Sequence, residues 1–170
     1  EVRLICEKAR EAFLDFSSLG LEGRNAALEA MAEALDQGAE EILIANQEDC
    51  RDAEEAVKLG NMSRAVFKRL SLDTNKLQSM VNNLYAVREL GDPLGCCDYA
   101  CCLDDGLALR RVTCPLGVVA AIFEARPDAI AQIASLCIKS GNAVILKGGK
   151  EASRTNRTTA RILKEAVALA

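Results

Sequence analysis

The sequence predicts an α/β protein built from three consecutive parts: a helical segment over residues 1–90, a β-hairpin over 95–113 and a βαβα unit over 114–170. Three observations lead to this prediction. Apolar residues recur at helical spacing in the first half of the chain, two alternating segments flank a short turn near its middle, and two apolar runs, each followed by a helical pattern, occupy the last third.

The first half contains five segments with apolar residues on one helical face. The first covers residues 4–16, the second is marked by apolar positions over 27–35, and the third is acidic and ends near Gly60. Two further helices are expected over 63–69 and 73–88. The region before residue 90 is therefore expected to be helical throughout.

The helical pattern stops at Gly91-Asp92-Pro93, a sequence typical of turns. Two short segments follow, residues 95–103 and 107–113, and Asp104-Asp105-Gly106 joins them. Apolar and polar residues alternate in the second segment, as they do in a strand. This region is expected to form a β-hairpin.

An apolar run over residues 117–123 predicts a parallel strand that is covered on both faces. A helix is expected next, with Pro127 and Asp128 at its start and Gly141 as its stop signal. Residues 143–146 predict a second buried strand, and a last helix extends to about Leu169. This order is typical of a right-handed unit of an open, Rossmann-like parallel sheet.

The composition excludes several classes of function. The chain has no His, which excludes Ser-His-Asp triads, Cys-His dyads and His-ligated metal sites. Aromatic residues make up 4% and Trp is absent, so we expect no nucleic-acid partner. No apolar run reaches the ~18 residues that a membrane span needs. Eight Cys without a signal peptide favour the reducing cytoplasm, and no zinc-ribbon spacing is found among them, so no metal site is expected.

Charge is distributed unevenly along the chain. Residues 1–60 carry 6 basic against 15 acidic side chains, whereas residues 110–170 carry 10 against 4. The basic last third could attract a small anionic ligand. Its helix carries a basic stripe that we expect to be mostly solvated surface, made of Lys150, Arg154, Arg157, Arg161 and Lys164.

In open α/β sheets, ligands bind beyond the carboxyl ends of the strands. The first such end presents Glu124 and Arg126, and the second is the bend Lys147-Gly148-Gly149-Lys150. We expect Lys147 and Lys150, with Arg154, to bind a phosphate at the start of the last helix, where an anion would compensate the positive end of the helix dipole. The glycines would let a ligand approach the backbone. The alternative is a charged loop without a ligand.

The stretch CPLGVVAAIFEARPDAIAQIASLCIKSGNAVILKGGKEA, residues 114–152, closely resembles the γ-glutamyl phosphate reductase family, a branch of the aldehyde dehydrogenase superfamily. The segments ILIANQEDCRDAE, KRLSLDTNKL and LDDGLALRRVTCP also occur, in the family's order. The resemblance covers nearly the whole chain and corresponds to the N-terminal part of a much longer enzyme.

This resemblance implies NADPH-dependent reduction of L-glutamate 5-phosphate to L-glutamate 5-semialdehyde and phosphate, in proline biosynthesis. In the family, a cysteine thiolate attacks the acyl phosphate and hydride reduces the resulting thioester. That cysteine belongs to a separate domain that follows the cofactor-binding segment, and none of the eight Cys here matches it. The chain is therefore expected to be a truncated NADP-binding domain, inactive alone and without a catalytic residue.

The residues that carry over bind the cofactor. Lys147 resembles the superfamily lysine that reaches the adenosine ribose, and Lys150 stands where NAD-preferring relatives often carry a glutamate. A cation there suits the 2′-phosphate of NADP(H). The expected set is completed by the neighbouring strand-end residues and the bend, namely Ile122, Phe123, Gly148 and Gly149.

The segment Glu124-Ala125-Arg126-Pro127 replaces the usual oxyanion-binding loop of aldehyde dehydrogenases, with Ala125 in place of an asparagine. We expect Arg126 to meet the phosphate or a carboxylate of the substrate and Glu124 to meet its ammonium group. The alternative for both is an ion pair that fixes the loop.

The hairpin resembles the superfamily's oligomerisation strands, which predicts a homo-oligomer. The role of its cysteines Cys96, Cys97, Cys101 and Cys102 stays open. Coupling to glutamate 5-kinase, which is fused ahead of this region in bifunctional eukaryotic relatives, also stays open. Two other functions remain: a catalytically dead nucleotide-binding or assembly module, and a dehydrogenase for another aldehyde or acyl phosphate.

Overall fold

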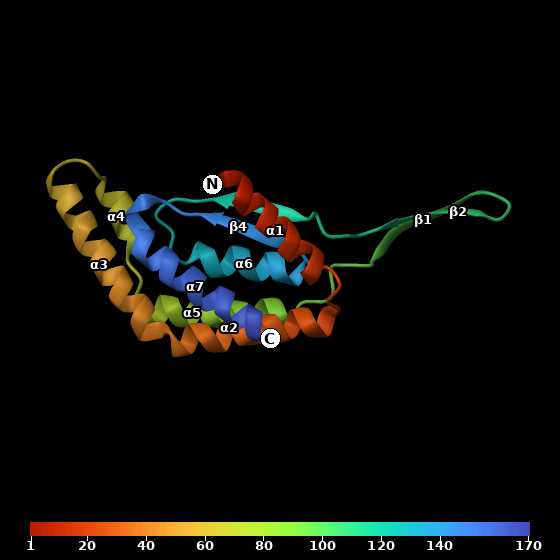
Figure 1. Cartoon of the computed structure of the whole chain (residues 1–170), viewed down its shortest axis with the longest axis horizontal. Coiled ribbons are helices and arrows are strands. Elements are labelled where there is room, and N and C mark those ends of the chain that lie inside the picture. The colour runs from red at the N-terminus through yellow and green to blue at the C-terminus, as the bar shows by residue number, and fades with distance from the viewer.

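A computed structural model describes all 170 residues and confirms the predicted order of elements (Figure 1). Five helices come first, then a hairpin, then a parallel strand pair with two helices. The elements are α1 (Val2–Phe16), α2 (Leu21–Gln37), α3 (Ala39–Lys58), α4 (Arg64–Leu70), α5 (Thr74–Arg88), β1 (Cys97–Asp104), β2 (Leu107–Val112), β3 (Val118–Ile122), α6 (Ala129–Lys139), β4 (Ala143–Lys147), the short 3₁₀ helix η1 (Lys150–Ala152) and α7 (Ser153–Leu169).

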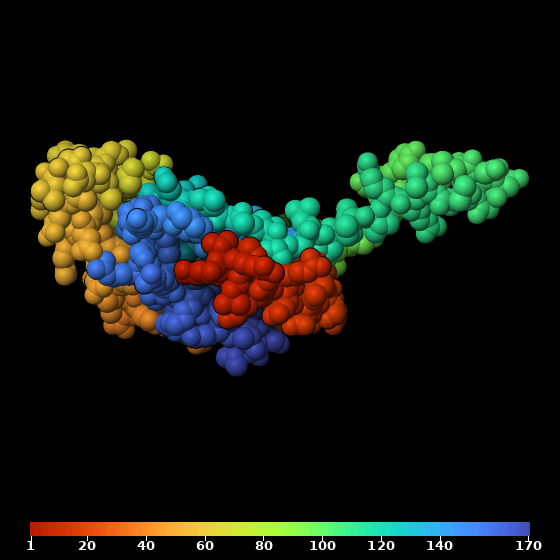
Figure 2. All heavy atoms as spheres, turned by 45° about the horizontal axis from the view of Figure 1, so that its top comes forward, coloured from red at the N-terminus to blue at the C-terminus, as the bar shows by residue number.

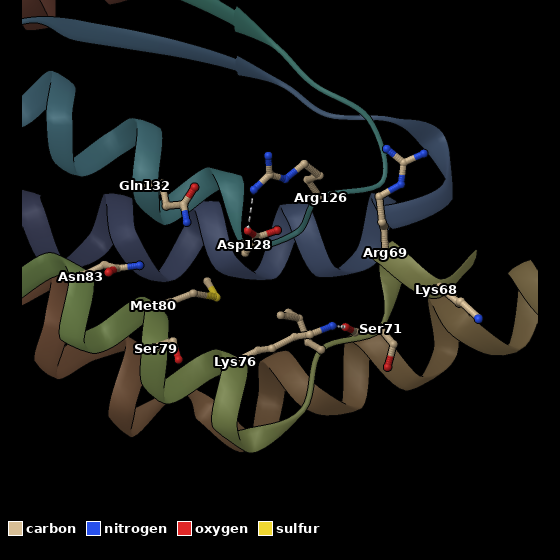
Figure 3. A pocket seen from close by; sticks show the side chains of 11 residues that line it. Lys68, Arg69, Ser71, Lys76, Ser79, Met80, Asn83, Arg126, Asp128 and Gln132 are labelled. Carbon is tan, nitrogen blue, oxygen red and sulfur yellow. Dashed lines mark hydrogen bonds and ion pairs between the residues drawn. The ribbon is translucent and has the colours of Figure 1, made fainter. Parts of the chain in front are cut away.

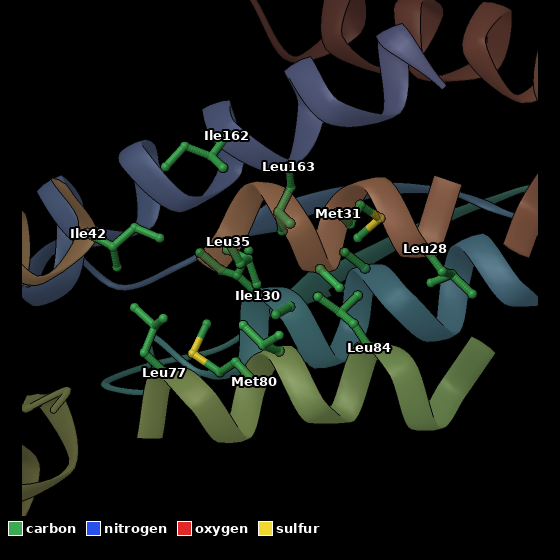
Figure 4. Close-up of a cluster of buried hydrophobic side chains, with 14 of the residues drawn as sticks. Leu28, Met31, Leu35, Ile42, Leu77, Met80, Leu84, Ile130, Ile162 and Leu163 are labelled. Carbon is green, nitrogen blue, oxygen red and sulfur yellow. The ribbon is translucent and has the colours of Figure 1, made fainter. Parts of the chain in front are cut away.

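The core lies where the apolar faces of α2, α5, α6 and α7 meet (Figure 4). Helix α6 lies between the sheet and the α2/α5 pair, because it packs against β4 as well as against both helices (Figure 1). Apolar residues at helical spacing supply this core, as the sequence predicts. Its buried members are Leu28, Met31, Ala32, Leu35, Ile42, Leu72, Leu77, Met80, Val81, Leu84, Ile130, Ala131, Ala134, Ile162 and Leu163.

Strands β3 and β4 form a parallel pair whose register runs from Val118 opposite Ala143 to Ile122 opposite Lys147. The carboxyl ends of both strands therefore lie side by side. The expectation that the strands are covered on both faces is wrong. Ile122 is 77% exposed and Val118 38% exposed, and most of β4 is only half-buried. The reason is that the sheet has two strands and that α1, which packs against them, buries none of its own residues.

Strands β1 and β2 form the predicted hairpin, which projects as an arm away from the helical body (Figures 1 and 2). The turn between them contains Gly106 at a φ of 78°, a left-handed conformation that glycine adopts at little cost. Except for the half-buried Cys101, every strand residue of the arm is exposed. The two strands of the arm pack against each other.

The acidic first part of the chain pairs with the basic last helix. Arg154 of α7 lies 2.6 Å from Asp52 and 3.3 Å from Glu48, both on α3, and Arg161 lies 2.6 Å from Glu41. Both arginines are exposed, as expected for the stripe, but they are also ion-paired because α3 and α7 pack against each other. Each exposed pair contributes little alone, but the pattern favours this one pairing of helices.

A buried cluster holds the base of the arm. The guanidinium of Arg24, on α2, is 2% exposed; it donates to the backbone oxygen of Lys139 at 2.5 Å and to both carboxylate oxygens of Asp92. Lys139 Nζ donates to Asn25 Oδ1 and to the backbone oxygen of Arg88. The cluster thereby joins α2, the end of α5, the end of α6 and the chain that enters the arm.

Two groups of this cluster have shifted pKa values. The backbone N–H of Leu94 and the guanidinium of Arg24 hold the pKa of Asp92 below its ordinary value. Burial lowers the pKa of Lys139, and the charge of Asp92 opposes that effect. The ionised carboxylate is thus the favoured form of Asp92 in the folded chain.

We expect Asp92→Asn to lower the free energy of unfolding at neutral pH, since Arg24 then loses its only carboxylate partner. Because the folded-state pKa is depressed, the stabilisation by Asp92 is complete above the unfolded pKa of about 3.9 and disappears as pH falls through the lower folded value. Urea unfolding of both proteins from pH 7 to pH 3 measures this. A difference that stays constant down to pH 3 would contradict it.

Candidate functional site

The parallel register brings three of the expected cofactor residues together. Ile122 lies opposite Lys147, and the backbone N–H of Phe123 donates to the oxygen of Lys147 at 3.1 Å. The bend 147–150 follows directly. Lys147 and Lys150 are both exposed, and neither makes an ion pair within the chain. Two ammonium groups without a carboxylate partner therefore flank the bend.

The start of α7 already has its compensating anion. The carboxylate of Asp49, which is buried on α3, accepts hydrogen bonds from the backbone N–H of Thr155 at 2.8 Å and of Arg154 at 3.3 Å. It also accepts from the Thr155 hydroxyl at 2.7 Å. The expectation that a ligand phosphate compensates this helix end is therefore wrong, because a protein carboxylate occupies the position. Arg154 does not join the two lysines, since carboxylates of α3 already hold it.

The ends of two side chains of the chain itself fill the space beside the two glycines of the bend. A Cβ on Gly148 would overlap the side chain of Asn156, and a Cβ on Gly149 would overlap that of Glu151. Asn156 and Glu151 thus occupy this space in the structure, and the approach of a ligand to the backbone here stays a prediction. Asn156 belongs to α7, and its side-chain nitrogen is the atom next to Gly148, whereas its side-chain oxygen is buried without a hydrogen-bond partner.

The loop that follows β3 has an unusual conformation. Ala125 is buried at a φ of 46°, the only residue other than glycine with a positive φ. Its backbone N–H donates to Glu151 Oε1 at 2.5 Å, which ties the loop to η1. The side chains on either side of Ala125 line different cavities, Arg126 the first and Glu124 the second. The fixed backbone of Ala125 thus determines where both charged groups lie.

Arg126 pairs with Asp128 at 3.1 Å, whereas Glu124 makes no ion pair or side-chain hydrogen bond. An ion pair that fixes the loop is therefore found for Arg126 but not for Glu124, and the partner of Arg126 is Asp128. Arg126 remains about half exposed, so its guanidinium retains donors for a ligand.

The cavity beside Arg126 has a volume of about 470 Å³ and is strongly basic (Figure 3). It lies between the α4–α5 connection, α5 and the start of α6. Its lining holds four cationic side chains and a single carboxylate, and only two residues are hydrophobic. The lining residues are Lys68, Arg69, Ser71, Leu72, Lys76, Ser79, Met80, Asn83, Arg126, Asp128 and Gln132.

A second cavity of about 320 Å³ adjoins the other side of the loop and includes Glu124, Ala125 and Glu151. Arg69 lines both cavities. The sequence did not single out Arg69, Lys68 or Lys76, because helical spacing marks them only as exposed positions of two short helices. Their approach to Arg126 depends on tertiary packing, for which the sequence holds no local signal.

Buried hydrogen bonds fix the wall of the basic cavity. Asn46, on α3, donates to the backbone oxygen of Leu70 at 3.0 Å and accepts from the backbone N–H of Leu72 at 2.8 Å. These contacts flank Ser71 on both sides. Asp73 then accepts from the backbone N–H of Lys76 at 2.7 Å and caps α5. The backbone that carries Arg69 and Lys76 is thus held from both ends.

The structure brings together no group of three or more side chains of the kinds that ligate metals. None of its helices combines the length and the apolar character that crossing a bilayer requires.

Comparisons with known proteins decide the family. γ-Glutamyl phosphate reductase from a Cyanothece species is 43% identical over 98% of the chain, and γ-glutamyl phosphate reductase 1 from a Synechocystis species is 46% identical over 96%. The crystal structure of the γ-glutamyl phosphate reductase from Saccharomyces cerevisiae matches 98% of the chain at 41% identity with a TM-score of 0.91. The chain belongs to the γ-glutamyl phosphate reductase family.

The chain spans 37% of the length of these two curated relatives and 41% of the yeast chain. An acetylating aldehyde dehydrogenase from Geobacillus thermoglucosidasius, 19% identical, shares the fold over 99% of the chain and 34% of its own with a TM-score of 0.71. The fold is therefore that of the N-terminal NAD-binding portion of the aldehyde dehydrogenases. No protein-family model matches the chain.

We expect Glu151→Ala to lower the free energy of unfolding by about 1–3 kcal/mol, because the buried N–H of Ala125 loses its acceptor. Glu151→Gln retains an acceptor oxygen and should cost less. Denaturant unfolding of the two variants measures the difference, and equal losses for both would contradict the role of this hydrogen bond.

Proposed function

We propose that the chain supplies the NADP-binding part of an enzyme that reduces L-glutamate 5-phosphate to L-glutamate 5-semialdehyde and phosphate, a step of proline biosynthesis. The observation that carries this proposal is the match of nearly the whole chain to γ-glutamyl phosphate reductases at 41–46% identity. The enzyme is thus an oxidoreductase of the aldehyde dehydrogenase superfamily.

The residues at the carboxyl ends of β3 and β4 fit a nicotinamide dinucleotide. Lys147 and Lys150 are exposed cations without an ion-pair partner in the chain, and they flank the bend that follows β4. Ammonium groups suit a phosphate, which supports Lys150 as the residue that selects the 2′-phosphate of NADP(H). Ile122 offers an exposed apolar surface beside them. The bound cofactor supplies the hydride.

The chain's cysteines are poorly suited to attack an acyl phosphate. Burial raises the pKa of the thiols of Cys50 and Cys137, which disfavours the reactive thiolate. Of the other six, four lie at the arm and Cys6 and Cys114 lie outside both cavities. We infer that the nucleophile belongs to sequence that the relatives possess in addition to this segment, and that the segment alone is inactive.

Substrate contacts are proposed for the loop after β3. Arg126 lines the basic cavity and would meet the phosphate or carboxylate of the substrate. Glu124 lines the adjoining cavity without a partner of its own and would meet the ammonium group. The fixed conformation of Ala125 keeps the two charges apart, as an amino-acid substrate with charges of both signs requires.

The arm supports the proposal of a homo-oligomer. It projects from the body (Figure 2). Its exposed side chains include Tyr99, Leu103 and Leu109. Exposed strand edges with apolar side chains tend to pair with a further strand. A second copy of the enzyme is the proposed partner of the arm. Coupling of the enzyme to glutamate 5-kinase is a separate proposal, which comes from the family resemblance alone.

We expect Lys150→Glu to weaken NADPH binding by about tenfold or more while NADH binding changes little, because one charged contact to the 2′-phosphate is lost. Fluorescence titration of each reduced cofactor measures both affinities. Lys164→Glu is the matched control, since Lys164 is an exposed lysine on α7 without an ion pair. Equal losses for the two cofactors would contradict the role of Lys150.

Replacement of Arg126 by Gln should raise the KM of the full-length enzyme for L-glutamate 5-semialdehyde or for phosphate in the reverse reaction. The expected rise is about tenfold, the cost of one charge-assisted hydrogen bond. Initial rates with NADP⁺ measure it. An unchanged KM for both substrates would remove Arg126 from the substrate site.

A further inference from the structure

We propose that the basic cavity holds an oxyanion of the substrate, and that Arg69 of α4 and Lys76 of α5 bind it and make the site specific for an anionic acyl compound. This inference rests on the proposed function and adds two binding residues to Arg126 and Glu124 of the loop after β3. The anionic group is either the phosphate or the α-carboxylate, since both present charged oxygens to cationic donors.

The charge of the cavity points to an anionic ligand. The cavity is lined by four cations, Lys68, Arg69, Lys76 and Arg126, and by one carboxylate, Asp128, which pairs with Arg126. Lys76 Nζ donates to the backbone oxygen of Ser71 at 2.5 Å and Arg69 Nε to that of Ala65 at 3.3 Å. Neither cation has a carboxylate partner within the chain. An anion would relieve the mutual repulsion of these groups.

The terminal nitrogens of Arg69 are the strongest candidates for ligand contact. Arg69 lines both cavities, so it lies between the side of the loop that carries Arg126 and the side that carries Glu124. In Figure 3 its guanidinium points toward the loop and away from α4. The two nitrogens beyond Nε make no hydrogen bond in the chain, and a planar guanidinium matches a carboxylate or phosphate with two parallel bonds.

The site is built on fixed backbone. Asn46 holds both residues that flank Ser71, and Asp73 caps the helix that carries Lys76. A cation on fixed backbone loses less conformational freedom on binding than one on a mobile loop. The volume of about 470 Å³ suits a small metabolite, and uncharged donors complete the lining, namely Ser79, Asn83 and Gln132.

The reverse reaction separates the two sources of the oxyanion, because phosphate and the amino-acid aldehyde are then separate substrates. Arg69→Gln and Lys76→Gln are exposed substitutions that leave the buried core unchanged. Each is expected to raise the KM for one of the two substrates by about tenfold. The matched control is Arg64→Gln, on the same helix as Arg69 but outside both cavities, and its KM values should equal those of the unsubstituted enzyme.

A rise in the KM for phosphate assigns the cavity to the phosphoryl group, and a rise for the semialdehyde assigns it to the α-carboxylate. If the unsubstituted enzyme is active and neither variant differs from the Arg64→Gln control, the inference is overturned while the proposed function stands.

If the enzyme shows no such activity, the proposed function fails, and calorimetric titration of the protein with inorganic phosphate and with L-glutamate still tests the cavity. Binding of either probe that Arg69→Gln or Lys76→Gln weakens about tenfold supports the site. Binding that neither variant changes, or no binding of either probe, overturns it.

Discussion

The proposed cofactor and substrate regions depend on one buried group of hydrogen bonds, in which Asn46 and Asp49 of α3 contact Thr155 of α7. Asp49 holds the first turn of α7 and thereby the bend that precedes it, while Asn46 bonds both Thr155 and the backbone between α4 and α5. Buried polar groups of this kind are costly to leave unpaired, so they admit few alternative arrangements. One turn of α3 therefore sets the distance between the proposed cofactor and substrate regions.

The same pairing explains the uneven charge of the sequence. The acidic α3 and the basic α7 lie together, and ion pairs at Arg154 and Arg161 join them. Other cations have no carboxylate partner in the chain, among them Lys147 and Lys150 after β4 and Lys68, Arg69 and Lys76 around the cavity next to Arg126. Anionic ligands are proposed at these two places.

Sequence reasoning predicted all seven α-helices and four strands in order, because apolar periodicity and turn residues are local signals, but it missed η1 and the first residues of α2. It also predicted two parallel strands, whose carboxyl ends lie at the same edge of the sheet, but not the register that places Ile122 opposite Lys147. It missed the partner of the α7 start, because Asp49 lies more than a hundred residues earlier in the chain. It missed Arg69 and Lys76 because their approach to Arg126 also depends on tertiary packing. It did not predict that Asn156 and Glu151 fill the space beside the two glycines.

Helix α6 connects the root of the arm with the loop that carries Arg126. Its last residue, Lys139, belongs to the cluster with Arg24 and Asp92 at the root of the arm, and its first turn follows Arg126 and Asp128. Eleven helical residues make a stiff rod of roughly 16 Å. This rod therefore fixes the distance between the root of the arm, where a second copy is proposed to bind, and the loop that carries Arg126, where the substrate is proposed to bind.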